Sequence, residues 1–184
     1  MPAATPGPRD PRPLTGEPLA LDLLNTRWVE DGAPRDLLDG TEGLTVWLAA
    51  NGLDGRFAAD ADTLRHTLRA RDALLAAVDG SLAAGAAAVD AVLAHGRIRA
   101  TLTEAGPGEE AEFEDASWGP GWLAARNYLT LLATAPDRVR RCAHEACVLH
   151  FFDTSRNGTR RWCSMAVCGN RAKASRHYAR SKDA

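Results

Sequence analysis

The spacing of apolar residues predicts that most of the chain is helical. Between residues 60 and 79, apolar side chains recur every three or four positions, as on the buried face of an amphipathic helix; they are Leu64, Leu68, Leu75 and Val78. Asp60 or Asp62 can begin this helix and Gly80 can end it. The positions between the apolar ones face the solvent and include Arg65, Arg69 and Asp72. His66 lies among them, which predicts an ordinary surface histidine.

Three other segments have helical patterns. Residues 41–52 start with a threonine that can cap a helix and end with a glycine that can stop it, and one face carries Leu44, Trp47 and Leu48. Residues 86–95 predict a short helix that ends at Gly96. A last long helix is expected to end before Pro136, with an apolar face formed by Trp122, Ala125, Leu129 and Leu132.

Two segments have other patterns. Apolar and polar residues alternate from Ile98 to Phe113 around a central Gly-Pro-Gly, which predicts a β-hairpin whose carboxylates lie on the solvated face. Residues 19–28 fit a strand or a short buried helix, and we favour the helix. Asn25 and Thr26 follow the apolar part of this run, so they can turn the chain or line a ligand pocket.

Composition divides the chain into three parts. Residues 1–18 hold six of the ten prolines and no periodic pattern, so they predict a flexible tail. Residues 19–137 form the helical domain, and a small C-terminal module covers residues 138–184. The connection between the last two is too short to be a flexible linker, so we expect them to pack together. The chain has no apolar run of about 18 residues and no apolar signal core, which predicts a cytoplasmic protein without a membrane span.

The C-terminal module contains all four cysteines of the chain, in two C-x4-C pairs separated by fifteen residues: Cys142 with Cys147, and Cys163 with Cys168. Zinc accepts four thiolates in a tetrahedron, and two short pairs joined by a longer loop are the pattern of a structural site. Four cysteines leave no open position for catalysis, so we expect one structural zinc ion per chain. Two disulfides are the alternative, which a reducing compartment disfavours. His144 and His150 are close enough to compete as ligands, but the matching pairs favour cysteine alone.

The sequence between and after the cysteines predicts a hairpin and a helix. Residues 148–152 and 159–162 are strand candidates on either side of the turn residues Asn157 and Gly158. A helix is expected from Gly169 onward, directly after the fourth cysteine, where its amino terminus would offset the negative charge of the thiolates. The whole chain is therefore predicted to be mainly α with a small β-hairpin, and its end to resemble a treble clef.

Charge separates the two domains more sharply than the net charge of −2 shows. Residues 1–137 hold eleven basic and twenty-one acidic residues, a net −10, whereas residues 138–184 hold eleven basic and three acidic residues, a net +8. Such asymmetry predicts a nucleic-acid surface on the basic part. The candidate contacts with DNA are Arg156, Arg160, Arg161, Arg171, Lys173, Arg176 and Arg180. A solvated basic face without a partner is the alternative.

Motifs around the cysteines resemble a known family. The run Cys163 to Arg171, which ends in Cys-Gly-Asn-Arg, is similar to the CGNR zinc finger, as are the preceding segments 152–156 and 160–162. In that family the finger follows a mostly helical ABATE domain assigned to stress-induced transcription regulation, whose opening motifs resemble residues 21–26 and 44–48 of this chain. The resemblance implies bacterial origin, zinc ligation by the four matching cysteines and DNA binding.

These observations predict a transcriptional regulator whose zinc finger docks on double-stranded DNA. The acidic helical domain would then sense a small-molecule effector or form a homodimer, because one finger alone gives little specificity. The alternative is a scaffold, or an RNA- or protein-binding module, in which the finger is purely structural. An enzyme is not expected, since the sequence has no nucleophile–base pair, phosphate-binding loop or open metal site.

Overall fold

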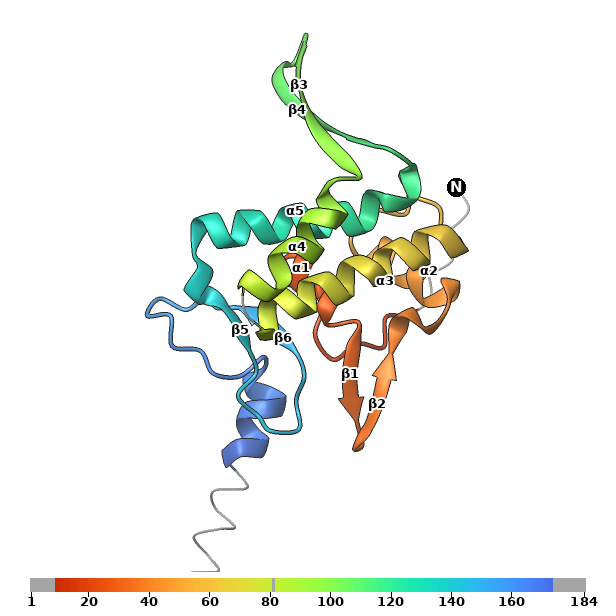
Figure 1. Cartoon of the computed structure of the whole chain (residues 1–184). Coiled ribbons are helices and arrows are strands. Elements are labelled where there is room, and N and C mark those ends of the chain that lie inside the picture. Colours follow the sequence, from red (N-terminus) through yellow and green to blue (C-terminus); the bar gives the residue numbers. More distant parts are fainter. Residues whose placement is uncertain (1–8, 81, 174–184) are drawn as a thin grey trace, which may run out of the picture.

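Helices form most of the computed structural model, which describes residues 9–80 and 82–173 (Figure 1). They are α1 (Leu19–Leu24), α2 (Thr41–Ala50), α3 (Ala61–Leu75), α4 (Leu82–Leu93) and α5 (Gly119–Thr134). The strands of the described residues form three antiparallel pairs, namely β1 (Arg27–Glu30) with β2 (Ala33–Asp36), β3 (Gly96–Thr103) with β4 (Gly106–Phe113), and β5 (Val139–Arg141) with β6 (His150–Phe152). This is the mainly α fold with small β-hairpins that the apolar pattern predicts. None of the helices described is long and apolar enough to cross a membrane.

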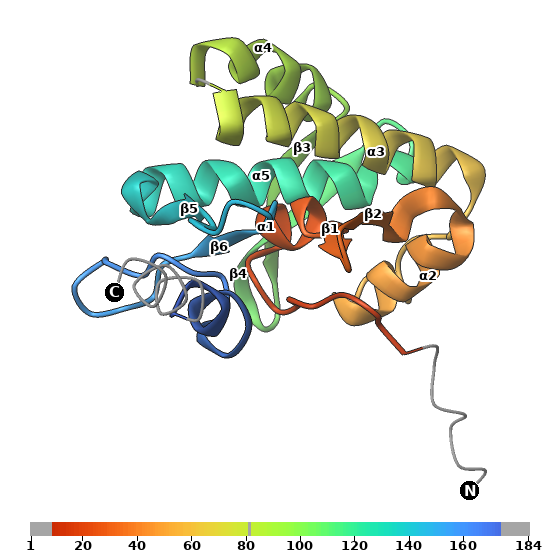
Figure 2. The same ribbon diagram turned by 90° about the horizontal axis from the view of Figure 1, so that it is seen from below.

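The short helix α1 lies in the middle of the molecule, between α5 and the C-terminal module (Figure 2). Leu21 and Leu23 on this helix are completely buried. The side chain of Asn127 on α5 accepts a hydrogen bond from the backbone N–H of Ala20 at 3.1 Å. A helix of six residues is not stable alone, so its packing partners on both sides keep α1 helical.

Helices α3, α4 and α5 pack against one another. The side chain of Asp60 caps α3 by accepting a hydrogen bond from the N–H of Thr63 at 2.8 Å, and a π-helical turn, Ala76–Gly80, leads on towards α4. Helix α5 opens with Gly-Pro-Gly, and a Cβ atom on Gly119 would come within 2.0 Å of the Phe57 ring. Glycine therefore allows the start of α5 to pack closely on this ring.

Two helical faces differ from the sequence prediction. His66 is buried, and its ring stacks on Trp118 at 3.9 Å, while the other face of Trp118 stacks on His95 at 3.6 Å. The prediction of a surface histidine was therefore wrong, because the aromatic partners lie far away in the sequence. On α5 the buried residues include Tyr128 and Leu131, whereas Leu129 is 45% exposed.

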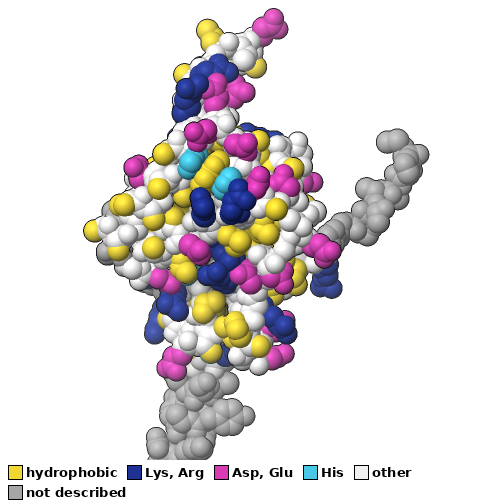
Figure 3. All heavy atoms as spheres, turned by 45° about the vertical axis from the view of Figure 1, so that its right-hand side comes forward, with side chains coloured by type: hydrophobic (Ala, Val, Ile, Leu, Met, Phe, Trp, Pro, Cys, Tyr) yellow, Lys and Arg dark blue, Asp and Glu magenta, His cyan; other side chains and the backbone are white. Residues whose placement is uncertain are grey.

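The hairpin of β3 and β4 projects from the helical body (Figure 1). Its register pairs Gly96 with Phe113 and Thr103 with Gly106, as the alternation predicts. Basic and acidic side chains lie side by side along it (Figure 3). Arg97 pairs with Glu112, and Arg99 pairs with both Glu110 and Glu112. These carboxylates are thus the exposed, ion-paired face of a hairpin.

A second hairpin, β1 with β2, was not predicted from the sequence. Asp31 and Gly32 between its strands have φ values of 51° and 80°. Two residues with positive φ form the tight turn that matches the twist of paired strands, and Asp-Gly is a preferred sequence for it. Pro34 in β2 obscures this signal, because proline cannot donate to a strand ladder.

Residues 9–18 pack on the body, in contrast to the flexible tail expected for residues 1–18. The Arg12 side chain is fully buried and pairs with Asp22 on α1 at 2.7 Å. Asp22 also accepts hydrogen bonds from the indole of Trp47 and the amide of Asn51, both at 3.0 Å. A buried carboxylate needs such partners, so the N-terminal segment supplies a cation that the helical core requires.

Candidate metal centre and domain interface

The four cysteines lie together in the C-terminal module, with their Sγ atoms all within 4.8 Å of one another. The separation is 3.8 Å between the sulfurs of Cys147 and Cys163, and 3.6 Å between those of Cys163 and Cys168. Disulfide sulfurs lie only about 2.05 Å apart. Zinc–sulfur bonds of about 2.3 Å in a tetrahedron would place the sulfurs about 3.8 Å apart. The cluster therefore has the spacing of a four-thiolate metal site.

Two structural elements position the sulfurs. Strands β5 and β6 pair Val139 with Phe152 and Arg141 with His150, and this hairpin carries the first cysteine pair at its tip. The second pair lies at the start of a helix that begins at Met165 and runs to the end of the described residues. The Ser164 side chain accepts a hydrogen bond from the N–H of Val167 and so caps this helix. Hairpin and helix give the treble-clef-like arrangement that the sequence predicts.

Two details of that prediction were wrong. Residues 148–152 contain strand β6, but its partner is β5, which precedes the first cysteine, and residues 159–162 form no strand. The helix begins at Met165, so Cys168 lies inside its first turns rather than before it. Both errors arise because strand pairing and helix capping across the cysteine pairs depend on contacts that local sequence patterns do not show.

The electrostatics of the cluster favour a bound cation. A hydrogen bond from Cys163 lowers the pKa of Cys147 to about 5. The same bond raises the pKa of Cys163, and burial raises the pKa of Cys168 to about 12. The first thiolate thus makes ionisation of its neighbours harder. A divalent metal ion removes this conflict because it stabilises all the thiolates together.

The loop between the two cysteine pairs is held by buried polar groups. Asp153 is completely buried and accepts hydrogen bonds from the N–H groups of Ser155 and Arg160, both at 2.9 Å. Arg138 donates to the carbonyls of Asp153 and Ser155 at 2.6 and 2.7 Å, and Arg140 donates to that of Gly158 at 2.9 Å. The finger thus uses several of its arginines to fix its own backbone.

The structure separates the predicted DNA contacts into two groups. Arg160 points inward, since it donates to the carbonyls of Trp162 and Cys163 and stacks over the Phe151 ring at 4.4 Å. Its geometry is structural, in contrast to the role expected from its charge. Four predicted residues are exposed: Arg156, Arg161, Arg171 and Lys173. Arg176 and Arg180 lie outside the described residues.

Asn25 and Thr26 turn the chain at the end of α1, which is the first of the two alternatives that the sequence leaves open, and Asn25 also joins the two domains. The Asn25 side chain donates to the carbonyl of His150 at 2.9 Å and accepts from its N–H at 2.8 Å. Thr26 accepts a hydrogen bond from Arg71 at 2.8 Å. Asn25, Thr26 and His150 are all buried. The motif at residues 21–26 therefore supplies buried polar groups that hold the finger and the core in place.

Two further residues, one inside the helical domain and one at the domain interface, have no signal in the sequence. Arg71 on α3 is 1% exposed and binds Asp36 through two hydrogen bonds of 2.6 and 2.8 Å. Asp79 accepts a hydrogen bond from the Nε2 of buried His150 at 2.7 Å and pairs with Arg141 at 3.7 Å. His150 thus faces the helical domain, and His144 accepts from the N–H of Ala146, so both contact groups other than the sulfurs.

Comparison with known proteins gives the family. None of the curated proteins with which the chain was compared matches it. The CGNR zinc finger matches residues 138–181, which include all four cysteines. The ABATE family, described as "Putative stress-induced transcription regulator", matches residues 17–135, which include the buried polar motif of α1 and all of the helices from α1 to α5. The chain therefore belongs to the ABATE family and carries a CGNR zinc finger at its C-terminal end.

Proposed function

We propose that this protein is a DNA-binding transcriptional regulator without enzymatic activity. The finger, built on one structural zinc ion held by the four cysteines, docks on double-stranded DNA. The helical domain senses an effector or forms a homodimer. The observation that carries the proposal is the charge division, a net −10 before residue 138 and a net +8 from there on. Basic residues that neutralise phosphates release counterions, which drives binding to DNA.

The surface of the finger supports this role. The four exposed residues Arg156, Arg161, Arg171 and Lys173 lie on the loop and the helix that follow the first cysteine pair. Between residues 138 and 173 the acidic residues are Glu145 and Asp153, and Asp153 is buried and bonded to backbone N–H groups. Within the described part of the finger itself, little negative charge therefore opposes this basic surface.

The test is the salt dependence of DNA binding by the full-length protein. Fluorescence anisotropy with a labelled duplex should give an association constant that falls with salt, with a logarithmic slope of about 0.9 for each phosphate neutralised. A variant with glutamine in place of the four exposed basic residues should bind weakly and with a smaller slope. The matched control replaces Arg56, Arg65, Arg69 and Arg97 on the helical domain, which removes the same charge. Equal loss in both variants, or no salt-dependent binding at all, would contradict the proposal.

A purely structural finger is the second candidate, and one observation favours it. Arg138, Arg140 and Arg160 hold the finger's own loop, and Asn25 and Asp79 hold the finger to the helical domain. On this alternative the partner is RNA or an acidic protein surface. A labelled single-stranded RNA measured in parallel separates the two, because only the regulator should prefer the duplex.

A further inference from the structure

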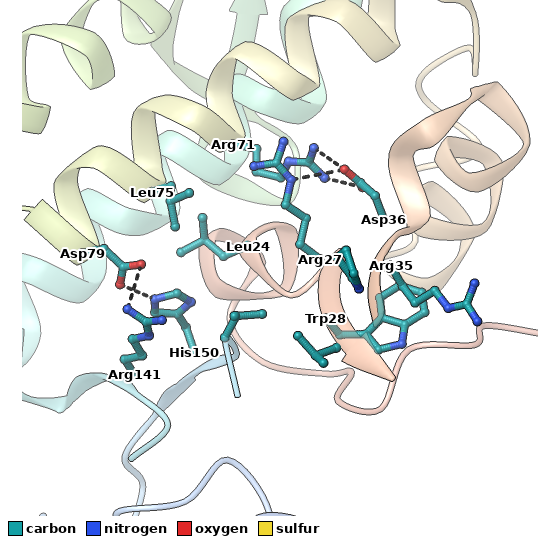
Figure 4. Close-up of a pocket in the computed structure, with 13 residues that line it drawn as sticks. Leu24, Arg27, Trp28, Arg35, Asp36, Arg71, Leu75, Asp79, Arg141 and His150 are labelled. Atoms are coloured by element: carbon teal, nitrogen blue, oxygen red, sulfur yellow. Dashed lines mark hydrogen bonds and ion pairs between the residues drawn. The ribbon is translucent and has the colours of Figure 1, made fainter. Parts of the chain in front are cut away.

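A pocket of about 520 Å³ lies between the helical domain and the finger (Figure 4). Sites for small molecules commonly have volumes of about 300–1,000 Å³. Strands β1 and β2 and helix α3 form one side of this pocket, and Arg141, Val148 and His150 of the finger form the other. A molecule in this pocket would therefore touch both domains.

The middle of the pocket is apolar and its ends are charged. Figure 4 shows Leu24 and Leu75 between two groups of charged residues. One group contains Asp79, Arg141 and His150, and the other contains Arg27, Arg71 and Asp36. An occupant that fits this arrangement has an apolar body and a charged end.

The sign of that charge follows from the ion pairs. Arg27, Arg35, Arg71 and Arg141 line the pocket, and its acidic residues are Asp36 and Asp79. Arg71 binds Asp36 with two hydrogen bonds and Arg27 donates to it at 3.2 Å, while His150 donates to Asp79 at 2.7 Å. Both carboxylates are thus satisfied within the protein. Arg35 pairs with Glu30 at 3.3 Å and Arg141 pairs with Asp79 at 3.7 Å, each through one nitrogen, and their side chains stay 55% and 53% exposed. Each guanidinium therefore keeps further N–H donors for the negative end of an occupant.

Two buried polar atoms of the lining have no partner among the described residues. They are Nδ1 of His150 and Nε of Arg71, and both residues are 1% exposed. Unpaired buried polar atoms are costly, and one lies in each charged group. Both atoms are covered by protein, so an occupant meets the exposed arginines of the rim rather than these two atoms.

We propose that the pocket binds a small organic anion, an apolar ring or chain that carries one carboxylate. Its body packs on Leu24 and Leu75 and its carboxylate meets the arginines of the rim. Because the anion contacts both domains, it stabilises one arrangement of the finger relative to the helical domain. The anion is then the effector of the regulator. That role rests on the proposed function, whereas the binding itself does not.

Binding is tested on the full-length protein without DNA. The probes are benzoate, phenylacetate and octanoate, each beside its neutral amide, in thermal-shift and calorimetric titrations. At least one carboxylate should raise Tm in a concentration-dependent way and bind about tenfold or more tightly than its amide. The proposal is overturned if none of the carboxylates binds at millimolar concentration, or if amide and carboxylate bind equally.

Variants locate the site. Leu75→Trp fills the middle of the pocket and should abolish binding, and Arg141→Gln should weaken it about tenfold or more. Arg69→Gln is the control, because Arg69 is exposed on α3, the helix that carries Leu75, and does not line the pocket. If circular dichroism shows that Leu75→Trp is unfolded, Arg141→Gln decides. Unchanged binding in Arg141→Gln would overturn the site. If the protein binds a carboxylate but does not bind DNA, only the proposed function is contradicted.

Discussion

The helical domain and the finger are held together by different forces. In the helical domain large apolar side chains such as Leu21, Leu44 and Trp47 are completely buried. In the described part of the finger the buried apolar residues are Leu149 and Phe151 together with three cysteines. Arginines of the finger also donate hydrogen bonds to backbone carbonyls, and Asp153 accepts hydrogen bonds from backbone N–H groups. The buried residues of both domains belong to one apolar cluster. The comparison shows that its helical part is stabilised by large apolar side chains, whereas its finger part depends on the cysteine ligands and polar pairing.

The first prediction removes the metal from the finger. Cys168→Ser should unfold the finger, because structural zinc contributes about 10–16 kcal/mol to folding in zinc-finger peptides. The helical domain should keep its far-UV circular dichroism. Zinc content measured by mass spectrometry should be one ion per chain in the wild type and close to none in the variant. Met165→Leu, an exposed change in the same turn, is the control. Zinc well below one equivalent in fresh wild-type protein would contradict the prediction.

The second prediction concerns the apolar packing of the helical domain. Leu44 is completely buried within the apolar cluster. Leu44→Ala should lower the free energy of unfolding by about 2–5 kcal/mol through lost contacts and the cavity that remains. Urea denaturation followed by circular dichroism measures the change. The zinc content of the folded variant should stay at that of the wild type, and a loss of zinc would show that the metal site depends on packing in the helical domain.

The third prediction concerns the junction between the helical domain and the finger. Asn25→Ala leaves both the N–H and the carbonyl of His150 without their buried partner. Each unsatisfied buried group costs about 1–3 kcal/mol, so we expect a loss of about 2–5 kcal/mol in denaturant unfolding. Asn25→Asp keeps the acceptor but buries a carboxylate beside the carbonyl of His150, so it should lose at least as much. Asn157→Ala, an exposed change in the finger loop, should be close to neutral. Equal effects in Asn25→Ala and Asn157→Ala would show that the carboxamide does not join the domains.

The fourth prediction separates two neighbouring arginines of the finger. Arg160 donates to two backbone carbonyls, whereas Arg161 is exposed and lies over the Trp162 ring at 5.3 Å. Arg160→Gln should cost about 1–3 kcal/mol of stability, and Arg161→Gln about 0.5 kcal/mol or less. In the anisotropy assay the order should reverse, so that Arg161→Gln weakens DNA binding more than Arg160→Gln does. Similar stability losses for both would remove the distinction between inward and outward arginines.

The smallest effect is a dependence on pH in the helical domain. Burial of Asp36 acts to raise its pKa, but the hydrogen bonds from Arg71 lower it below the ordinary value of 3.8. A group with a lowered pKa in the folded state stabilises the protein above its unfolded pKa and loses this contribution as pH falls through the folded value. Wild-type stability should therefore decrease below about pH 4. Asp36→Asn should flatten that decrease in urea titrations, and an unchanged profile would contradict the prediction.

Local pattern was enough to predict where several of the helices and the projecting hairpin lie. Helix α2 has its expected face at Leu44, Trp47 and Leu48, and the alternation between Ile98 and Phe113 gives the β3–β4 hairpin. The four cysteines meet as their spacing predicts. In each case the determining residues are close in sequence or share a strong chemical preference, so few alternatives compete.

The buried polar residues could not be predicted in the same way. Arg71 and Asp36 are 35 positions apart, and nothing local distinguishes Arg71 from the exposed arginines of α3. Arg160 and Arg161 are adjacent and have the same charge, yet only Arg160 binds the backbone of its own loop. Asn25 was expected at a turn or in a pocket, and its partner is 125 residues away. The roles of such residues depend on tertiary contacts, and the local pattern of a single sequence does not show these contacts.

The pair of hydrogen bonds between Asn25 and His150 also affects how far this finger can be treated as a transferable module. The carboxamide of Asn25 pairs with the N–H and the carbonyl of His150 at the edge of β6, as a neighbouring strand would. Asn25 itself belongs to the helical domain. A finger grafted onto an unrelated protein would expose this edge. We therefore expect fusions that retain α1 and Asn25 to yield a folded finger, and the two domains to be exchanged between proteins only as a unit.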